Sequence, residues 1–277
     1  MTTARFECYG VPIELAADDA RTLRRMRARL PPAARAIAAT ERAKDRANGR
    51  AKNRAIDRAK KFRVRAPADA AALQAFESKL ALHVAAESRA FLFVHAGVVG
   101  WRGRAIVLPG RTHAGKSTLV AALVRAGATY YSDEYALVDG DGRVWPYPRP
   151  LSLRRARGPV RVRPERLGRV GRGPLPVGLV VLCRFAARTK LGPLSPGRAL
   201  LALLKQTVAA RAQAATAMER LSRIVTTAPV AAGTRGEAGE FARALLGGTH
   251  LDPPKRDGKR RNRPSAMGDR RRLHSRR

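Results

Sequence analysis

The sequence predicts an α/β fold, in which a central sheet is covered by flanking helices. Short β-rich runs alternate with longer stretches of helical periodicity along the chain. The apolar run VGLVVLCRF, residues 177–185, is typical of a buried central strand. The stretch RAIVLPGRTHAGKSTLVAALVRAG, residues 104–127, leads from a strand into a helix through a glycine-containing loop. Together these observations indicate a layered α/β domain.

Composition sets wide limits on this fold. The 277 residues suggest one large domain or one domain with appendages, and 45% hydrophobic residues suffice for a core. The formal net charge of +35 predicts attraction to polyanions and says little about the fold. Cys8 and Cys183 lie far apart with no metal-ligand spacing, which favours a reducing compartment over a disulfide framework. Cys183 lies in an apolar run and is interpreted as an inert core thiol.

The sequence predicts no membrane segment. The opening residues MTTARFECYG lack the apolar stretch of a signal peptide. No run of about 18 apolar residues follows, so no transmembrane helix is expected. We therefore expect a cytoplasmic protein.

Residues 1–90 are expected to form an N-terminal α+β region. Residues 4–14 alternate like a strand. A helix is expected to begin near Asp18 or Asp19 and to end before two prolines. Residues 68–90 carry a second helical pattern, with apolar residues at helical spacing.

Residues 42–61 interrupt this region with a four-residue repeat that begins with Arg-Ala. Successive arginines would advance by about 40° around a helix, so they form no single face. The repeat has no apolar stripe to bury, and packing cannot stabilise it as a helix. A solvated or disordered insertion is the preferred interpretation. A nucleic-acid-binding arm and a translation-frame artefact are the alternatives.

The core is expected over residues 91–252, followed by a disordered basic tail at 253–277 that lacks core-forming residues. The elements expected in the core are two β-rich runs joined near 100–103, a helix at 116–127, strands around a turn at 139–142, an extended edge segment at 145–154, a buried strand at 177–185, a helix at 196–222, a strand at 223–233 and a helix at 237–248.

The clearest functional signal is the pattern Gly-x-x-x-x-Gly-Lys-Ser between a predicted strand and a predicted helix. Such a loop cradles phosphates with backbone N–H groups, while its lysine reaches the β- and γ-phosphates and its serine ligates Mg²⁺. ATP and Mg²⁺ are therefore the expected ligands. The predicted nucleotide-binding residues are Gly110, Arg111, Thr112, His113, Ala114, Gly115, Lys116, Ser117 and Thr118.

A carboxylate should complete this site, either for Mg²⁺ or for the nucleophile. The 177–185 run ends without an acidic residue, which counts against a general ATPase of this loop class. The better candidates are Asp133 and Glu134, which follow a short β-like segment and lie 17 and 18 residues after Lys116. An exposed strand end is the alternative interpretation of the pair. Asp139 and Asp141 are interpreted as turn formers.

Residues 91–155, from FVHAGVVG through the loop to YYSDEYALVD and beyond, resemble the catalytic core of the bacterial HPr serine kinase/phosphorylase group. They look most like its diverged relatives, and phosphoenolpyruvate carboxykinases share the distant core. The resemblance extends loosely over residues 4–250. It implies a mixed-sheet kinase core that binds ATP·Mg²⁺ and transfers the γ-phosphoryl group to a hydroxyl. The family's hexameric habit implies a possible homo-oligomer.

The resemblance also assigns roles. His95 matches a histidine near the active site, and Asp133 matches the general base. Glu134 replaces a second aspartate that ligates Mg²⁺ with Ser117. His113 stands where the kinases carry glycine. The family's downstream glycine-rich signature is not visible, so HPr is not the expected acceptor. A protein, peptide or small-molecule hydroxyl is expected instead.

Three side chains can each be interpreted in two ways. His95, beside Ala96 and Gly97 on an apolar strand, fits a core residue as well as a site residue. Arg149 and Arg154 could stabilise charge on the transferred phosphoryl group, or could be surface charges. We place Lys116, Asp133, His95 and Arg154 in the predicted catalytic set.

The leading functional hypothesis is a kinase. The alternatives are a nucleotide-binding protein associated with nucleic acid through its basic segments, and a non-catalytic regulator. No zinc spacing or aromatic RNA-binding signature supports sequence-specific readout, so nucleic acid is expected to bind only non-specifically.

Overall fold

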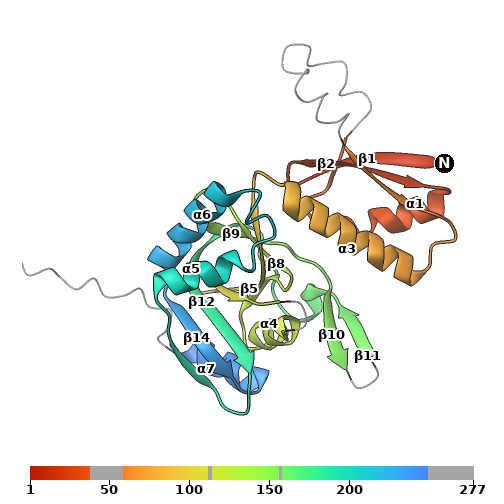
Figure 1. The fold of residues 1–277 in the computed structure, drawn as a ribbon. Helices are drawn as coiled ribbons and strands as arrows, with labels where there is room; N and C mark the ends of the chain where they lie inside the picture. The colour runs from red at the N-terminus through yellow and green to blue at the C-terminus, as the bar shows by residue number, and fades with distance from the viewer. Residues whose placement is uncertain (38–58, 112–113, 156–157, 249–277) are drawn as a thin grey trace, which may run out of the picture.

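The chain has a mixed α/β structure built around two separate larger sheets (Figure 1). The computed structural model describes residues 1–37, 59–111, 114–155 and 158–248. In this part of the chain, no helix combines the length and the apolar character needed to cross a membrane. The sequence-predicted α/β class with mixed sheets and flanking helices is confirmed. The predicted tail at 253–277 lies outside the described residues, and so does most of the 42–61 repeat.

The N-terminal sheet has the strand order β3-β1-β2-β4 and is covered by two helices. Its elements are β1 (Thr2–Cys8), β2 (Val11–Ala17), α1 (Ala20–Arg27), β3 (Arg35–Ala36), β4 (Lys60–Val64) and α3 (Ala70–Glu87). The single strand expected at 4–14 is wrong, because the chain reverses at Tyr9 and Gly10 and forms the β1–β2 hairpin. Both turn residues have positive φ, 52° and 79°, a conformation that glycine adopts without strain.

Both helix starts in this region follow from capping aspartates. Asp19 accepts a hydrogen bond from the Thr22 N–H at 2.6 Å, and Asp69 accepts one from the Ala72 N–H at 2.6 Å. A side-chain oxygen at this position satisfies an otherwise unpaired helix N–H group. The helix predicted near Asp18 or Asp19 is confirmed, and so is the second helix, which buries Leu73 on its apolar face.

The end of the predicted insertion needs a correction. Lys60 and Lys61 were assigned to the 42–61 repeat, but they are the first residues of β4, which runs parallel to β2. The strand forms here because Phe62 and Val64 alternate with charged residues and bury their side chains in the core.

The second sheet contains eight described strands and carries the remaining helices. The elements are β5 (Leu92–Trp101), β6 (Arg104–Pro109), α4 (Lys116–Arg125), β7 (Thr129–Ser132), β8 (Tyr135–Val138), β9 (Arg143–Trp145), β10 (Leu151–Arg155), β11 (Gly158–Val162), a 3₁₀ turn (Pro164–Arg166), β12 (Leu175–Phe185), β13 (Lys190–Pro193), α5 (Pro196–Leu204), α6 (Ala214–Thr227), β14 (Val230–Arg235) and α7 (Ala238–Gly247). β10 and β11 form a hairpin apart from this sheet.

The strand order β13-β14-β12-β6-β5-β8-β9 combines parallel and antiparallel pairs. β12 is parallel to both β6 and β14, which confirms the buried central strand predicted at 177–185. β9 also pairs with the start of β12, so the sheet curls back on itself. β7 pairs with β5 beside β8, and the short link between β7 and β8 therefore lies at the C-terminal side of the loop-bearing strand β6.

Three of the predicted core elements differ from the structure. The helix expected at 196–222 is divided into α5 and α6. The strand expected at 223–233 begins only at Val230, because the preceding residues continue α6. The segment 145–154 was expected to be an edge of the sheet, but its last residues form β10, which pairs with the unpredicted β11.

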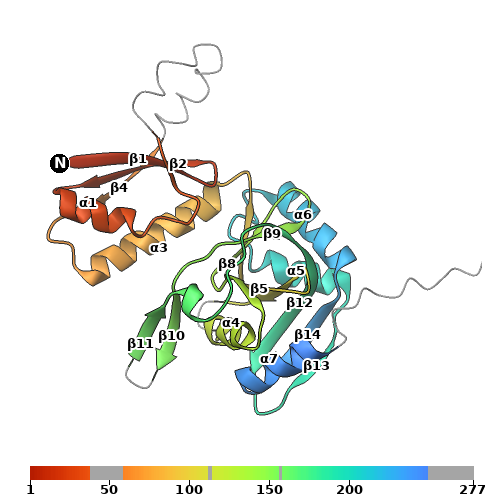
Figure 2. The same ribbon diagram turned by 180° about the vertical axis from the view of Figure 1, so that it is seen from behind.

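Helices cover both faces of the second sheet (Figures 1 and 2). α4 and α7 pack together on one face, in a core cluster with β6 and β12. α5 and α6 pack together on the other face. A third cluster joins the N-terminal sheet and α3 to the second sheet through aromatic rings, including Phe93, Tyr135 and Tyr147. The division predicted at residue 90 lies in the link from α3 to β5, and it remains a prediction.

Candidate functional site

The glycine loop connects the end of β6 to the start of α4. Gly115 caps α4 with φ of +77°, and a Cβ atom there would lie 2.8 Å from the Arg235 guanidinium. The positive φ is the constraint that favours glycine, because the flexible Arg235 side chain could move away from a Cβ atom. Gly115 carries no capping side chain, so the first N–H groups of α4 have no side-chain acceptor at the cap. Such a helix start is a ready-made site for an anion.

Lys116 lies curled against this loop. Its Nζ donates to the backbone carbonyls of Gly110 and Arg111, both at 2.8 Å. Burial lowers the pKa of Lys116, while the negative charges of Asp133 and Glu134 act in the opposite direction. Ala114 closes a turn onto the Arg111 carbonyl at 3.2 Å. Thr112 and His113 lie outside the described residues, whereas Thr118 is exposed beside the pocket.

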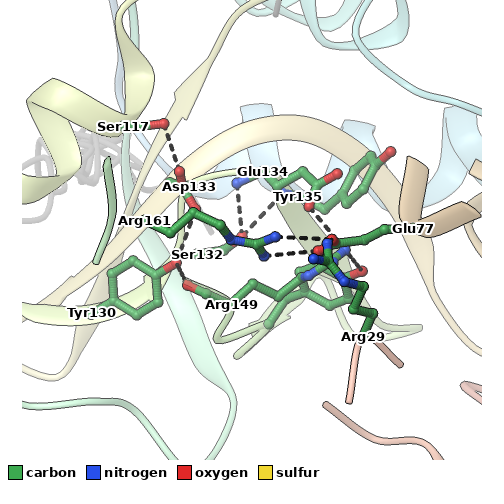
Figure 3. A network of polar contacts seen from close by, with 11 residues as sticks. Arg29, Glu77, Ser117, Tyr130, Ser132, Asp133, Glu134, Tyr135, Arg149 and Arg161 are labelled. Atoms are coloured by element: carbon green, nitrogen blue, oxygen red, sulfur yellow. Dashed lines mark hydrogen bonds and ion pairs between the residues drawn. The ribbon is translucent and has the colours of Figure 1, made fainter. Parts of the chain in front are cut away.

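Asp133 belongs to the tight link between β7 and β8, and it contacts the glycine loop. Its Oδ2 accepts a hydrogen bond from Ser117 Oγ at 2.6 Å, and Tyr130 Oη lies 3.0 Å from its Oδ1 (Figure 3). The hydroxyl of Ser132 accepts the N–H groups of Glu134 and Tyr135, which holds the link in a turn. Burial raises the pKa of Asp133, although its two hydroxyl donors stabilise the charged form.

Glu134 has a different partner, Arg149, which precedes β10. Its Oε2 lies 3.4 Å from Arg149 Nη1, and 40% of its side-chain surface remains exposed to the pocket. Burial, followed by the charge of Asp133, raises the pKa of Glu134 to about 7, and the charges of Lys116 and Arg161 oppose this shift. The adjacent carboxylates therefore face different walls of one pocket.

That pocket has a volume of about 800 Å³. The glycine loop and α4 form one wall, and the acidic pair and His95 form a second. The third wall comes from α3 and the β10–β11 hairpin. The lining residues are Gln74, Glu77, Ser78, His95, Gly115, Lys116, Ser117, Thr118, Asp133, Glu134, Arg149, Pro150, Ser152, Arg154, Pro159 and Arg161.

His95 faces this pocket from β5 and is only half-buried, which argues against the core-residue interpretation. It stands opposite Tyr135 in the β5–β8 pairing, with ring centroids 4.8 Å apart. Burial and the positive charge of Lys116 lower the pKa of His95, which favours a neutral imidazole.

The two arginines of the proline-containing segment occupy different positions. Arg149 is only 8% exposed, so its interpretation as a surface charge is wrong. Its guanidinium forms an ion pair with Glu77 of α3. Arg154 is an exposed residue of β10 that lines the pocket.

Sequence reasoning missed four residues of this region: Glu77, Tyr130, Arg161 and Arg235. Glu77 did leave a signal, because it lies four residues after Leu73 and three before Leu80 on the apolar stripe of α3. A carboxylate on a buried helix face requires a partner, and one should have been sought. Tyr130, Arg161 and Arg235 carry no comparable local pattern.

The residues around the loop fit a hard cation bound mainly by a nucleotide. The described residues contain no cluster of three or more His, Cys, Asp or Glu side chains that could hold a metal by itself. Mg²⁺ in phosphoryl-transfer sites needs only one or two protein oxygens besides phosphate and water. Ser117 Oγ and the Asp133 carboxylate, 2.6 Å apart, supply such oxygens.

Comparisons with known proteins give little beyond this geometry. No protein-family model matches the chain, and no curated protein sequence matches it. Among solved structures, the Hpr(Ser) kinase/phosphatase from Coxiella burnetii aligns with a TM-score of 0.35 and 14% sequence identity, over 56% of this chain and 93% of that one. This weak similarity suggests a distant relationship and carries no conclusion about function.

Proposed function

We propose that the protein is an ATP-dependent phosphotransferase that phosphorylates a hydroxyl group of a protein, peptide or small-molecule acceptor. The single observation that carries the proposal is the hydrogen bond of 2.6 Å between Ser117 and Asp133. It brings a carboxylate from the β7–β8 link to the start of α4, where the helix end and Lys116 favour a phosphate. In a nucleotide site, the same two side chains would hold Mg²⁺.

The reaction transfers one group and one proton. The acceptor oxygen forms a bond to the γ-phosphorus of ATP as the bond to the bridging oxygen breaks, and ADP leaves with that electron pair. Lys116 stabilises the negative charge of the phosphates. Mg²⁺, when bound, would neutralise further phosphate charge. The proton of the acceptor hydroxyl passes to a carboxylate of the site.

The geometry favours Glu134 as this proton acceptor, although the family resemblance assigns the role to Asp133. The Asp133 carboxylate accepts hydrogen bonds from Ser117 and Tyr130, so it is held next to the glycine loop. Glu134 faces the open pocket, where an acceptor would enter. Its pKa of about 7 suits a general base, because the charged form is populated and still takes up a proton.

Three variants test both the activity and this division of roles. Lys116→Ala should abolish labelling of acceptors from γ-labelled ATP. Glu134→Gln should retain nucleotide binding, measured by calorimetry, and reduce transfer by about 100-fold or more. Asp133→Asn should weaken Mg²⁺-dependent nucleotide binding itself. The exposed Glu219→Gln serves as a charge-matched control and should behave like the unaltered protein.

The outcomes separate the hypotheses. One outcome would restore Asp133 as the base. In it, Glu134→Gln keeps full transfer activity, whereas Asp133→Asn loses transfer but still binds nucleotide. Nucleotide binding without transfer to any acceptor would favour the non-catalytic regulator. A protein that takes up no nucleotide would overturn the proposal.

A further inference from the structure

The wall of the pocket that faces the glycine loop contains an unusual charge arrangement. Three guanidinium groups meet the single carboxylate of Glu77 (Figure 3). Arg29 Nη1 lies 2.6 Å from its Oε2, and Arg161 binds both oxygens at 2.9 and 3.0 Å. Arg149 donates to the Oε1 of the same carboxylate. Glu77 therefore faces three positive charges, and among the described residues the other carboxylate paired with them is Glu134, 3.4 Å from Arg149.

The positive charges of this cluster repel one another. The pKa of Arg149 is lowered to about 10, first by burial and then by the charge of Arg161, and the charge of Arg29 adds to the effect. The pKa of Arg29 is also lowered by burial and by the charge of Arg161. An additional anion beside these arginines would relieve this repulsion.

The cluster has N–H groups that can reach such an anion. Arg161 exposes 42% of its side chain and lines the pocket. A guanidinium offers five N–H donors, and the pair with Glu77 uses two of those of Arg161. Arg154 lines the same wall from β10. Paired arginines of this kind suit the planar oxygens of a carboxylate or the oxygens of a phosphate.

We propose that this wall, with Arg161 and Arg154 as contacts, binds an anionic group of the acceptor, so that the acceptor is a hydroxyl compound bearing a phosphate or a carboxylate. Naming the bound molecule as the acceptor rests on the proposed phosphotransfer, whereas the anion site itself does not. Glu134 lies between the two walls, because it neighbours Asp133 in the chain and contacts Arg149. The hydroxyl would face Glu134 while the anionic group lies against the arginines. The acceptor's charge is then held apart from the phosphates at the loop.

A binding experiment tests the anion site without any requirement for catalysis. Glycerol 3-phosphate, glycerate and uncharged glycerol are titrated onto the Lys116→Ala protein, in which the loop has lost its lysine. Both anions, or one of them, should bind and raise the melting temperature, and glycerol at the same concentration should not. The double variant Arg154→Gln/Arg161→Gln, made in the same background, should lose about tenfold or more in affinity. The two anions distinguish a phosphate site from a carboxylate site.

The control addresses the high net charge of the chain. Arg172 is exposed and does not line the pocket, so Arg172→Gln removes one positive charge elsewhere. It should leave the affinity for either anion unchanged. Equal weakening by Arg172→Gln and by the Arg154→Gln/Arg161→Gln double variant, or an absence of anion binding to the Lys116→Ala protein, would overturn the site. Melting curves of each variant establish that it is folded.

A transfer experiment then connects the site to the reaction. With γ-labelled ATP and the unaltered protein, the anionic acceptors should be labelled about tenfold or more faster than glycerol at low acceptor concentration. Arg161→Gln should raise the KM for the anionic acceptor more than it lowers kcat. Anion binding without any transfer would contradict the phosphotransferase and leave the anion site standing. Equal labelling of charged and uncharged acceptors would contradict the anion site and leave the phosphotransferase standing.

Discussion

Two neighbouring residues, Asp133 and Glu134, illustrate how the surroundings of a carboxyl group determine its pKa. Both carboxyl groups are partly desolvated, and burial raises the pKa of each. Asp133 receives hydrogen bonds from Ser117 and Tyr130, which favour its charged form. Glu134 has the negative charge of Asp133 next to it, which favours its neutral form. Environments that separate the pKa values of adjacent carboxyls are a common basis for acid–base chemistry.

The raised pKa of Glu134 predicts how the free energy of unfolding depends on pH. The pKa is about 7 in the folded protein, compared with an ordinary value of 4.5. The folded state therefore binds more protons than the unfolded state between these values, and stability falls as pH rises from about 4.5 to about 7. Glu134→Gln removes this penalty, so the variant should gain stability relative to the unaltered protein at pH 8 but much less at pH 5. Urea denaturation at both values measures the difference.

The matched control for this experiment is Glu219→Gln, whose carboxylate is 61% exposed on α6. It should show the same small effect at both pH values. If Glu134→Gln gains no more stability at pH 8 than at pH 5, the raised pKa is wrong, and the choice of Glu134 as general base loses its electrostatic support.

At the scale of elements, α3 is the helix that connects the N-terminal sheet to the candidate site. Its apolar face buries Leu73 and Leu80 in the N-terminal core, and Glu77 on the same face contacts Arg29 of the N-terminal region and two arginines from the rest of the chain. Arg149 precedes β10, and Arg161 belongs to β11. Glu77 thus ties the β10–β11 hairpin to α3, and the third wall of the pocket depends on this contact.

We predict that Glu77→Gln destabilises the protein by about 3 kcal/mol, because it removes the carboxylate bonded to the buried Arg149 and leaves only the longer contact with Glu134 as a counter-charge. Glu77 is 5% exposed and Arg149 is 8% exposed, so little water reaches either side chain to replace the lost carboxylate. Glu219→Gln, which breaks an exposed ion pair with Arg223, should cost less than about 0.5 kcal/mol. Denaturant unfolding of the two variants compares them directly. If Glu77→Gln lost as little stability as Glu219→Gln, the prediction would be wrong and the arginine cluster would already be hydrated.

The elements that the sequence predicts well are those whose signals are local. The loop and α4 follow from contiguous residues, and the Asp133 position follows from its spacing after Lys116. The contacts of Glu77 could not be predicted, because its partners Arg149 and Arg161 lie 72 and 84 residues away. The β10–β11 hairpin was missed because prolines and glycine obscure its alternating pattern. The roles of the site residues remain predictions.

At the scale of the whole molecule, the candidate site lies where several parts of the chain converge. The loop comes from the second sheet, α3 from the N-terminal region, and Arg154 and Arg161 from the separate hairpin. An aromatic cluster that includes Tyr9, Phe93 and Tyr147 packs the two sheets against each other. The third wall and the glycine loop belong to different elements, so the residues of the third wall can be substituted without altering the loop.

The net charge of +35 also belongs to the whole molecule, and it predicts binding to nucleic acid without sequence preference. Residues 253–277 are rich in arginine and lie outside the described residues. The chain lacking them should bind random-sequence DNA more weakly and with a shallower dependence on salt, because fewer counterions are released. The proposed phosphoryl transfer should proceed at the same rate as in the full chain, because the lining residues of the pocket are all present. Fluorescence anisotropy over a salt series and labelling from ATP measure the two properties. Loss of transfer together with loss of DNA binding would instead favour a nucleotide-binding protein that acts on nucleic acid.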